Sequence, residues 1–227
     1  MMHDCTIAVL SAFEQYADPE RAIPMRAYMK DIDTFYGIPS PTRKQLLRQT
    51  LAQYPKSILS EWKQIVIELI EKGNREAFYS AIEIAEKAYK YWDVGAIDVL
   101  LKMSHHKPWW DTIDAIAPLI GMYFKAFPEK RDHFISEWMN SGNMWLQRIC
   151  LLFQKRYKSE TDKELLFELC LRLADEKEFF IRKGMGWALR EYSYVNPKAV
   201  SSFVQTSPLS ALTKKEAMKA INRKNHS

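Results

Sequence analysis

The chain has 227 residues, a formal net charge of +5 and 47% hydrophobic residues. With 27% charged residues, this composition excludes a disordered chain and is ordinary for a soluble globular protein. No uninterrupted apolar run approaches the roughly 20 residues that span a bilayer, so we expect no membrane-spanning segment. The mild positive excess is compatible with a nucleic-acid partner but does not by itself select one.

The N-terminal stretch MMHDCTIAVL has no Lys or Arg before its short apolar run, which is not typical of a signal peptide. The three cysteines, Cys5, Cys150 and Cys170, are odd in number and widely spaced. Cys150 and Cys170 sit inside apolar patterns, which predicts buried reduced thiols and fits a cytoplasmic location. His105 and His106 have no Cys or acidic residue at metal-ligand spacing, so we expect no metal site. The sequence also lacks GxGxxG and GxxxxGK[ST], which excludes the common glycine-rich phosphate loops.

Apolar residues recur with a period near 3.6 in almost every window, which predicts an all-α protein. Residues 57–72, SILSEWKQIVIELIEK, carry one such stripe, and residues 75–89 and 163–176 repeat the pattern. The members of the first stripe are Ile58, Trp62, Ile65, Leu69 and Ile70. Thr161 to Glu164, TDKE, resembles a capping box at the start of a helix, and SGN at 141–143 predicts a turn before another.

An internal echo predicts how these helices are organised. MWLQRICLLFQKRY (144–157) can be laid over EFFIRKGMGWALRE (178–191), so that Arg148 falls on Arg182, 34 residues further on. A period in the thirties with two helices in each unit is the signature of an α-solenoid. We therefore expect HEAT-like helical hairpins stacked into a curved slab with a basic concave face, as one continuous domain over residues 1–227.

The stretch PWWDTIDAIAP (108–118) combines aromatic and acidic residues at the start of a predicted helix. Trp110 and Asp114 are four residues apart and share a helix face, next to the apolar stripe. Asp111 is better placed as an acid in the first turn, where it favours the helix dipole. The alternative is structural, with both acids capping or decorating the helix and both tryptophans packing in the core.

A second unusual feature is a row of basic residues in apolar helices. Arg148 and Arg182 each interrupt an apolar pattern, either as the partner of a buried acid or as a contact for an anion. Lys183, Trp187 and Arg190 follow Arg182 within three turns. Basic side chains interleaved with aromatic rings suit a phosphate backbone with stacked sugars or bases, although core packing would also explain Trp187.

Four stretches together resemble the AlkD-like DNA alkylation repair family, which consists of HEAT-like-repeat DNA glycosylases. They are YMKDIDTFYGIPSPTRKQLL, PWWDTIDAIAP, MWLQRICLLFQKRY and FFIRKGMGWALREYSYVNP, and the resemblance runs from about Met25 to about Leu212. It implies hydrolysis of the N-glycosidic bond of cationic alkylated purines, such as 3-methyladenine and 7-methylguanine, in duplex DNA, which initiates base excision repair. It also implies a monomer that needs no cofactor.

The resemblance assigns roles to particular residues. The family's catalytic acid corresponds to Asp114, and its companion tryptophans correspond to Trp110 and Trp187. Arg148 corresponds to the arginine that holds a backbone phosphate or pairs with the acid, and Tyr28 to the family's DNA-contacting tyrosine. The remaining basic residues of the row are expected to bind DNA, and they are Arg182, Lys183 and Arg190.

Two other classes of protein remain open at this point. A non-catalytic solenoid that binds branched or damaged DNA should lack the acid at position 114, whereas this sequence has Asp114. A scaffold for protein interactions, a frequent use of HEAT repeats, predicts an apolar concave face in place of a basic aromatic one.

Overall fold

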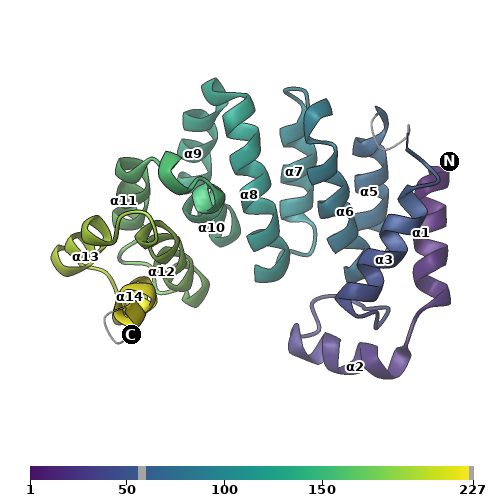
Figure 1. The fold of residues 1–227 in the computed structure, drawn as a ribbon, viewed down its shortest axis with the longest axis horizontal. Coiled ribbons are helices and arrows are strands. Elements are labelled where there is room, and N and C mark those ends of the chain that lie inside the picture. The colour runs from purple at the N-terminus through teal and green to yellow at the C-terminus, as the bar shows by residue number, and fades with distance from the viewer. Residues whose placement is uncertain (56–59, 225–227) are drawn as a thin grey trace. The chain divides into compact units, whose positions relative to one another are not determined.

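The computed structural model describes residues 1–55 and 60–224, and every regular element in that part of the chain is a helix (Figure 1). The predicted all-α class is therefore confirmed. The predicted stripe at 57–72 lies on α5, except for Ile58, which is outside the described residues. The α-helices are α1 (Asp4–Gln15), α2 (Pro19–Tyr28), α3 (Ser40–Leu51), α5 (Trp62–Lys72), α6 (Arg75–Lys87), α7 (Ala96–His105), α8 (Trp110–Ala126), α9 (Arg131–Asn140), α10 (Met144–Leu152), α11 (Lys163–Arg172), α12 (Phe179–Ser193), α13 (Pro197–Thr206) and α14 (Ala211–Lys224). Short 3₁₀ turns, η1 (Tyr89–Tyr91), η2 (Pro128–Lys130), η3 (Phe153–Arg156) and η4 (Lys158–Glu160), lie between some of them.

The chain divides into two compact units, residues 1–112 and residues 113–227, with the division inside α8. The single continuous domain, the curvature of the solenoid and its basic concave face stay predictions.

The first unit is built from helical hairpins around an apolar core. Helix α5 packs against α1, α6 and α7, and only residues 73–74 connect α5 to α6, which makes these two helices antiparallel neighbours. The stripe predicted from the sequence is buried here, since Ile65 and Leu69 are fully shielded from solvent. Helix α2 differs from the others because none of its residues is buried.

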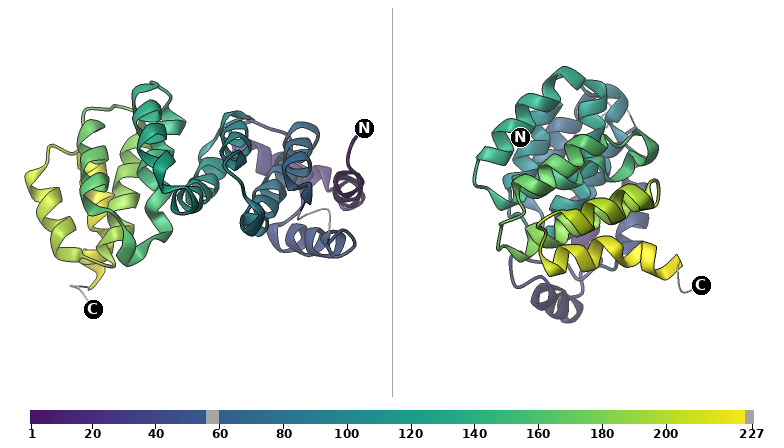
Figure 2. Two further views of the ribbon diagram at one scale, coloured as in Figure 1. Left: turned by 90° about the horizontal axis from the view of Figure 1, so that it is seen from above. Right: turned by 90° about the vertical axis from the view of Figure 1, so that its left-hand side faces the viewer.

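The second unit is also built from helical hairpins, with α12 at its centre. Helix α12 packs against α10, α13 and α14, and the last three helices lie together at the C-terminal end of the chain (Figure 2). Gly186 permits the close approach of α12 and α14, because a Cβ atom there would lie 2.4 Å from the Cβ of Glu216 on α14. Asn143 caps α10 after the predicted turn, but the predicted box at 161–164 is wrong in detail, since Asp162 is the capping residue of α11.

One buried carboxylate fixes the segment between α2 and α3. Glu76, in the first turn of α6, is 1% exposed and accepts the backbone N–H groups of Tyr36, Gly37 and Ile38 at 3.0, 2.8 and 3.0 Å. Gly37 has a φ of +85°, and a Cβ there would lie 2.1 Å from the carbonyl oxygen of Asp18. Residues 36–38 are therefore held against α6 by hydrogen bonds to a buried carboxylate. Because the carboxylate is buried, water cannot take the place of these bonds.

Replacing Glu76 by Gln tests how much these hydrogen bonds stabilise the fold. The amide keeps the shape but turns a donor group toward backbone donors, so the free energy of unfolding should fall by about 2 to 3 kcal/mol. Urea unfolding followed by circular dichroism measures the difference. The matched control is Glu168→Gln, because Glu168 is largely exposed and its pair with Arg172 spans 3.9 Å, so that change should be close to neutral. Equal losses in the two variants would contradict the special role of Glu76.

Candidate active site

Asp114 and Arg148 form a bidentate ion pair within the second unit. Asp114 lies in the second turn of α8, and Arg148 projects from the middle of α10. The Nε and Nη2 groups of Arg148 donate to the two carboxylate oxygens of Asp114 at 2.7 and 2.9 Å. The Arg148 side chain is 4% exposed and that of Asp114 is 11% exposed. The pair therefore holds a carboxylate in one orientation at the edge of solvent.

The rest of the Arg148 side chain is enclosed by α12. Its Nη1 group donates to the carbonyl oxygen of Phe180, and the position of Gly184 leaves the room, since a Cβ there would lie 3.1 Å from Nη1. A guanidinium has five N–H donors, and three of them are used by these contacts. Of the two roles that the sequence left open for Arg148, the structure contains the pairing with a nearly buried acid, and phosphate binding stays a prediction.

Trp187 lies on α12 with one ring face against a cation. The Nζ atom of Lys155, on η3, lies 3.7 Å from the centre of the Trp187 ring, and the indole N–H donates to Glu191 at 2.9 Å. Burial lowers the pKa of Lys155, and the negative charges of Asp114 and Glu191 act in the opposite direction. The half-buried ring is thus held in place, with the ammonium group of Lys155 against one of its faces.

Three basic side chains converge on Glu216, which belongs to α14. Lys183 and Arg190 from α12 and Lys219 from α14 lie 2.7, 3.0 and 2.6 Å from its carboxylate oxygens. The Glu216 side chain is only 8% exposed, whereas the three cations keep between 24% and 41% of their side chains in contact with solvent. Three positive charges around one negative charge leave a local excess that suits a phosphate.

Arg182 does not share the environment of Arg148, although the internal echo aligns the two. Its Nε donates to the carbonyl oxygen of Glu176 at 2.9 Å, and the residue is partly exposed. The repeated position therefore carries a buried ion pair in one hairpin and a hydrogen bond to a loop carbonyl in the next. The structure brings Arg182, Lys183 and Arg190 onto one helix, and their binding to DNA stays a prediction.

Tyr28 and Trp110 form an aromatic pair in the first unit. Tyr28 ends α2 and Trp110 begins α8, and their rings meet edge to face with centroids 6.3 Å apart and an interplanar angle of 83°. Tyr28 is 71% exposed, which is unusual for a large aromatic residue, and Trp110 is half-buried. An edge-to-face pair that is open to solvent offers apolar ring surface to a ligand.

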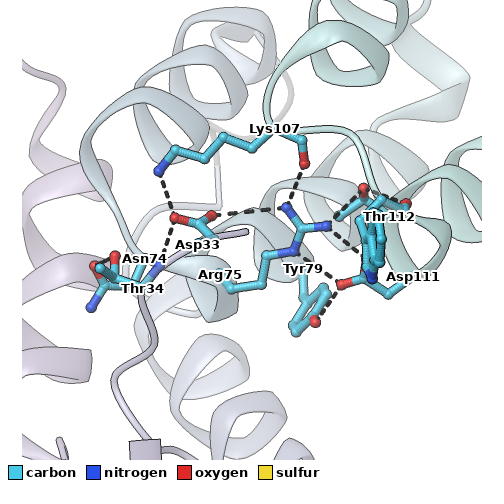
Figure 3. A network of polar contacts seen from close by, with 9 residues as sticks. Asp33, Thr34, Asn74, Arg75, Tyr79, Lys107, Asp111 and Thr112 are labelled. Carbon is cyan, nitrogen blue, oxygen red and sulfur yellow. Dashed lines mark hydrogen bonds and ion pairs between the residues drawn. The ribbon is translucent and has the colours of Figure 1, made fainter. Parts of the chain in front are cut away.

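Asp111 occupies a different environment from the one that its sequence position predicted. It accepts from the Nε and Nη2 groups of Arg75 at 3.0 and 2.6 Å, and from the hydroxyl of Tyr79 at 2.6 Å (Figure 3). The acid is thus a partner of a buried guanidinium as well as a first-turn residue. Sequence reasoning missed Arg75 because it stands in the polar stretch GNRE at a helix start, where arginine is usually solvated. Lys155 was missed for a similar reason, since FQKRY reads as a basic helix end.

No group of three or more His, Cys, Asp or Glu side chains in residues 1–55 and 60–224 is arranged to hold a metal ion. Among the described helices, none combines the length and the apolar character needed to cross a membrane.

The helical architecture thus presents a carboxylate on α8 that is held in one orientation, together with several partly exposed cations. A sequence model of the family described as "DNA alkylation repair enzyme" matches residues 9–221. A solved structure described as "Predicted DNA alkylation repair enzyme from Enterococcus faecalis" is 30% identical, with a TM-score of 0.79, over 89% of this chain and 95% of that one. No curated protein sequence matches. The chain belongs to the DNA alkylation repair enzyme family.

The Glu216 cluster should make stability depend on pH. Burial raises the pKa of Glu216, but hydrogen bonds from Lys183 and Lys219 and their charges outweigh burial and bring it to about 2. Because the folded pKa lies below the usual 4.5, the stabilisation is present above pH 4.5 and is lost as pH falls toward 2. The wild type should exceed Glu216→Gln in free energy of unfolding at pH 6, and this difference should shrink at pH 3. A difference that is the same at both pH values would contradict the assignment.

Proposed function

We propose that the protein is a monofunctional DNA glycosylase that hydrolyses the N-glycosidic bond of cationic alkylated purines in duplex DNA. The observation that carries this proposal is the carboxylate of Asp114, held by two nitrogens of a buried arginine while part of it reaches solvent. The acid has this geometry in a chain of the DNA alkylation repair enzyme family, at the position that the resemblance gives to the catalytic acid.

The proposed reaction needs a carboxylate more than it needs a general acid. A 3-methyladenine or 7-methylguanine base carries a positive charge, so it leaves with the bonding electrons as a neutral base. The deoxyribose becomes oxocarbenium-like, and a nearby carboxylate stabilises the developing positive charge. The oxygen of a water molecule then bonds to C1′, and Asp114 or solvent takes the released proton.

Arg148 supports this chemistry by orienting the acid. A bidentate guanidinium allows little rotation of the carboxylate, so both oxygens keep their directions before the substrate arrives. Two N–H groups of Arg148 remain after its contacts with Asp114 and Phe180, and one of them can donate to a backbone phosphate without breaking the pair.

The aromatic residues are assigned to binding a positively charged nucleotide. Trp187 holds the ammonium of Lys155 over its ring, so this face binds a cation, and the cationic nucleotide would take the place of Lys155 there. Trp110 with Tyr28 is assigned to the same purpose in the first unit, through ring surface that is open to solvent. A cation–π contact contributes about 0.5 to 1 kcal/mol at an exposed site, and about 2 or more when it is desolvated.

The basic residues of α12 are assigned to the phosphate backbone. Lys183 and Arg190 keep their side chains partly in solvent while Glu216 fixes their positions, and Arg182 adds a third charge on the same helix. Phosphate contacts of this kind position the duplex without reading its sequence, as an enzyme that acts on scattered lesions requires.

The decisive experiment compares wild type with Asp114→Asn in release of methylated bases from alkylated duplex DNA. We expect the asparagine variant to lose most of the activity, by about a hundredfold or more, because the amide lacks the charge that stabilises the transition state. Its binding to the same DNA should change little. Asp132→Asn is the control, since the Asp132 side chain is 80% exposed and pairs with the neighbouring Arg131.

Two results would count against the proposal. Release by wild type that is no faster than the spontaneous rate would exclude the glycosylase and leave a non-catalytic binder of damaged DNA. Full activity in Asp114→Asn would remove Asp114 from the mechanism.

A salt titration tests the phosphate role of α12. We expect Arg190→Gln to weaken binding to any duplex and to reduce the slope of log K against log salt concentration by about one. Arg172→Gln is the control, because Arg172 lies on α11 and pairs with Asn140 and Glu168. A slope for Arg190→Gln that equals that of wild type would exclude a phosphate contact.

A further inference from the structure

The first residue of α6 is a buried arginine that holds the start of α8. Arg75 is 0% exposed, and all three of its side-chain nitrogens are used (Figure 3). Two of them bind the carboxylate of Asp111, as described above, and Nη1 donates to the carbonyl oxygen of Lys107 at 2.8 Å. The Nη2 group also lies 3.2 Å from the hydroxyl of Thr112. One guanidinium therefore contacts three residues in a stretch of six.

In the sequence, Trp110 lies between Lys107 and Asp111, two of the residues that Arg75 binds. Lys107 comes three residues before it and Asp111 comes directly after it. The backbone of Lys107 has a φ of +40°, a conformation that a side chain other than glycine rarely adopts. A loop with such a residue keeps its shape only when contacts from outside over-determine it, and Arg75 and Asp33 supply those contacts.

Asp33 extends the same cluster toward Tyr28. Its side chain is 3% exposed, accepts from Nζ of Lys107 at 2.5 Å and lies 3.8 Å from Nη1 of Arg75. The backbone N–H of Arg75 donates to the carbonyl oxygen of Thr34 at 2.9 Å. Because Asp33 follows Tyr28 by five residues, the cluster fixes the chain on both sides of the aromatic pair.

The positive and negative charges in this cluster compensate each other, but charge compensation alone does not explain why charged residues are buried here. Arg75 and Lys107 face Asp33 and Asp111, with Tyr79 donating a further hydrogen bond to Asp111. Burial raises the pKa of the Tyr79 hydroxyl, and the charge of Asp111 adds to this effect, so the hydroxyl stays a donor. An apolar cluster of the same volume would stabilise the fold at least as well as a buried ion pair. It would not, however, fix the orientation of the side chains and of the backbone around it.

We propose that Arg75 is a positioning residue, which acts through Asp111 and Lys107 to hold the indole of Trp110 against Tyr28 in the orientation that binds the cationic nucleotide. This inference rests on the proposed function. It predicts that the orientation of Trp110, and with it the rate of base release, depends on a guanidinium that never contacts the DNA.

The experiment combines a spectroscopic reading with kinetics in the full-length protein. With 5-fluorotryptophan in all tryptophan positions, the ¹⁹F resonance of Trp110 is identified by its loss in Trp110→Phe. In Asp111→Asn this resonance should shift or split, and kcat for release of methylated bases should fall about tenfold or more, since small displacements near a reacting centre are costly. KM should stay within about twofold, because the phosphate contacts are intact.

Two further variants make the test specific. Tyr79→Phe removes one hydrogen bond to Asp111 while keeping the ion pair, so it should change both readings in the same direction but less, and it remains useful if Asp111→Asn folds poorly. Glu68→Gln is the matched control in the same unit. Glu68 accepts from the backbone of His3 and the hydroxyl of Thr6 at 2.9 and 2.7 Å, and its loss should leave the Trp110 resonance and kcat as in wild type.

The outcomes separate this inference from the proposed function. An unchanged Trp110 resonance in Asp111→Asn, or an equal change in Glu68→Gln, overturns the positioning role whatever the activity. A changed resonance with an unchanged kcat also overturns it. If wild type releases no base at all, the glycosylase proposal fails, and the ¹⁹F spectra alone then decide whether Arg75 positions Trp110.

Discussion

The guanidinium–carboxylate pair inside the helical stack is the interaction on which the candidate site depends. A buried arginine requires an acidic partner, because water cannot reach its charge to solvate it. Arg148 meets Asp114 in one unit, and Arg75 meets Asp111 in the other. Each pair joins helices that are remote in sequence, so the same contact that connects hairpins also fixes the direction of a carboxylate.

The two acids of α8 show how one chemical group is used in two ways. Asp111 accepts hydrogen bonds from Arg75 and Tyr79, and 9% of its side chain is exposed. Asp114 accepts two hydrogen bonds from Arg148, and 11% of its side chain is exposed. The two acids therefore differ in their partners and not in their exposure, although they are only three positions apart.

The helices could be predicted from the sequence because their apolar stripes depend on local spacing. Ile65 and Leu69 were placed in the core correctly, and the turn before α10 was recognised from SGN. Local rules decided these features, since hydrophobic burial selects the face of a helix and Asn143 caps its own helix. The choice of Asp162 over Thr161 as the cap of α11 was missed, because both residue types are good caps.

The candidate site could be predicted only in part. The resemblance pointed to Asp114, and pairing was one of two roles left open for Arg148. The partners of Arg75 and Lys183 were not predictable, because each lies more than 30 residues away on another helix and depends on how the hairpins stack. Aligned repeat positions did not help either, since Arg182 matches Arg148 in the echo but donates to the carbonyl oxygen of Glu176 instead of to an acid.

The burial of the three thiols has a consequence for a protein that belongs to an alkylation repair family. Cys5, Cys150 and Cys170 are all free and buried, and burial raises their pKa, to about 11 for Cys5 and about 12 for Cys150. The thiolate is the form that attacks electrophiles, and almost none of it exists at neutral pH when the pKa is so high. A methylating agent at neutral pH therefore meets these three sulfur atoms almost entirely as buried thiols, which are far less reactive than thiolates.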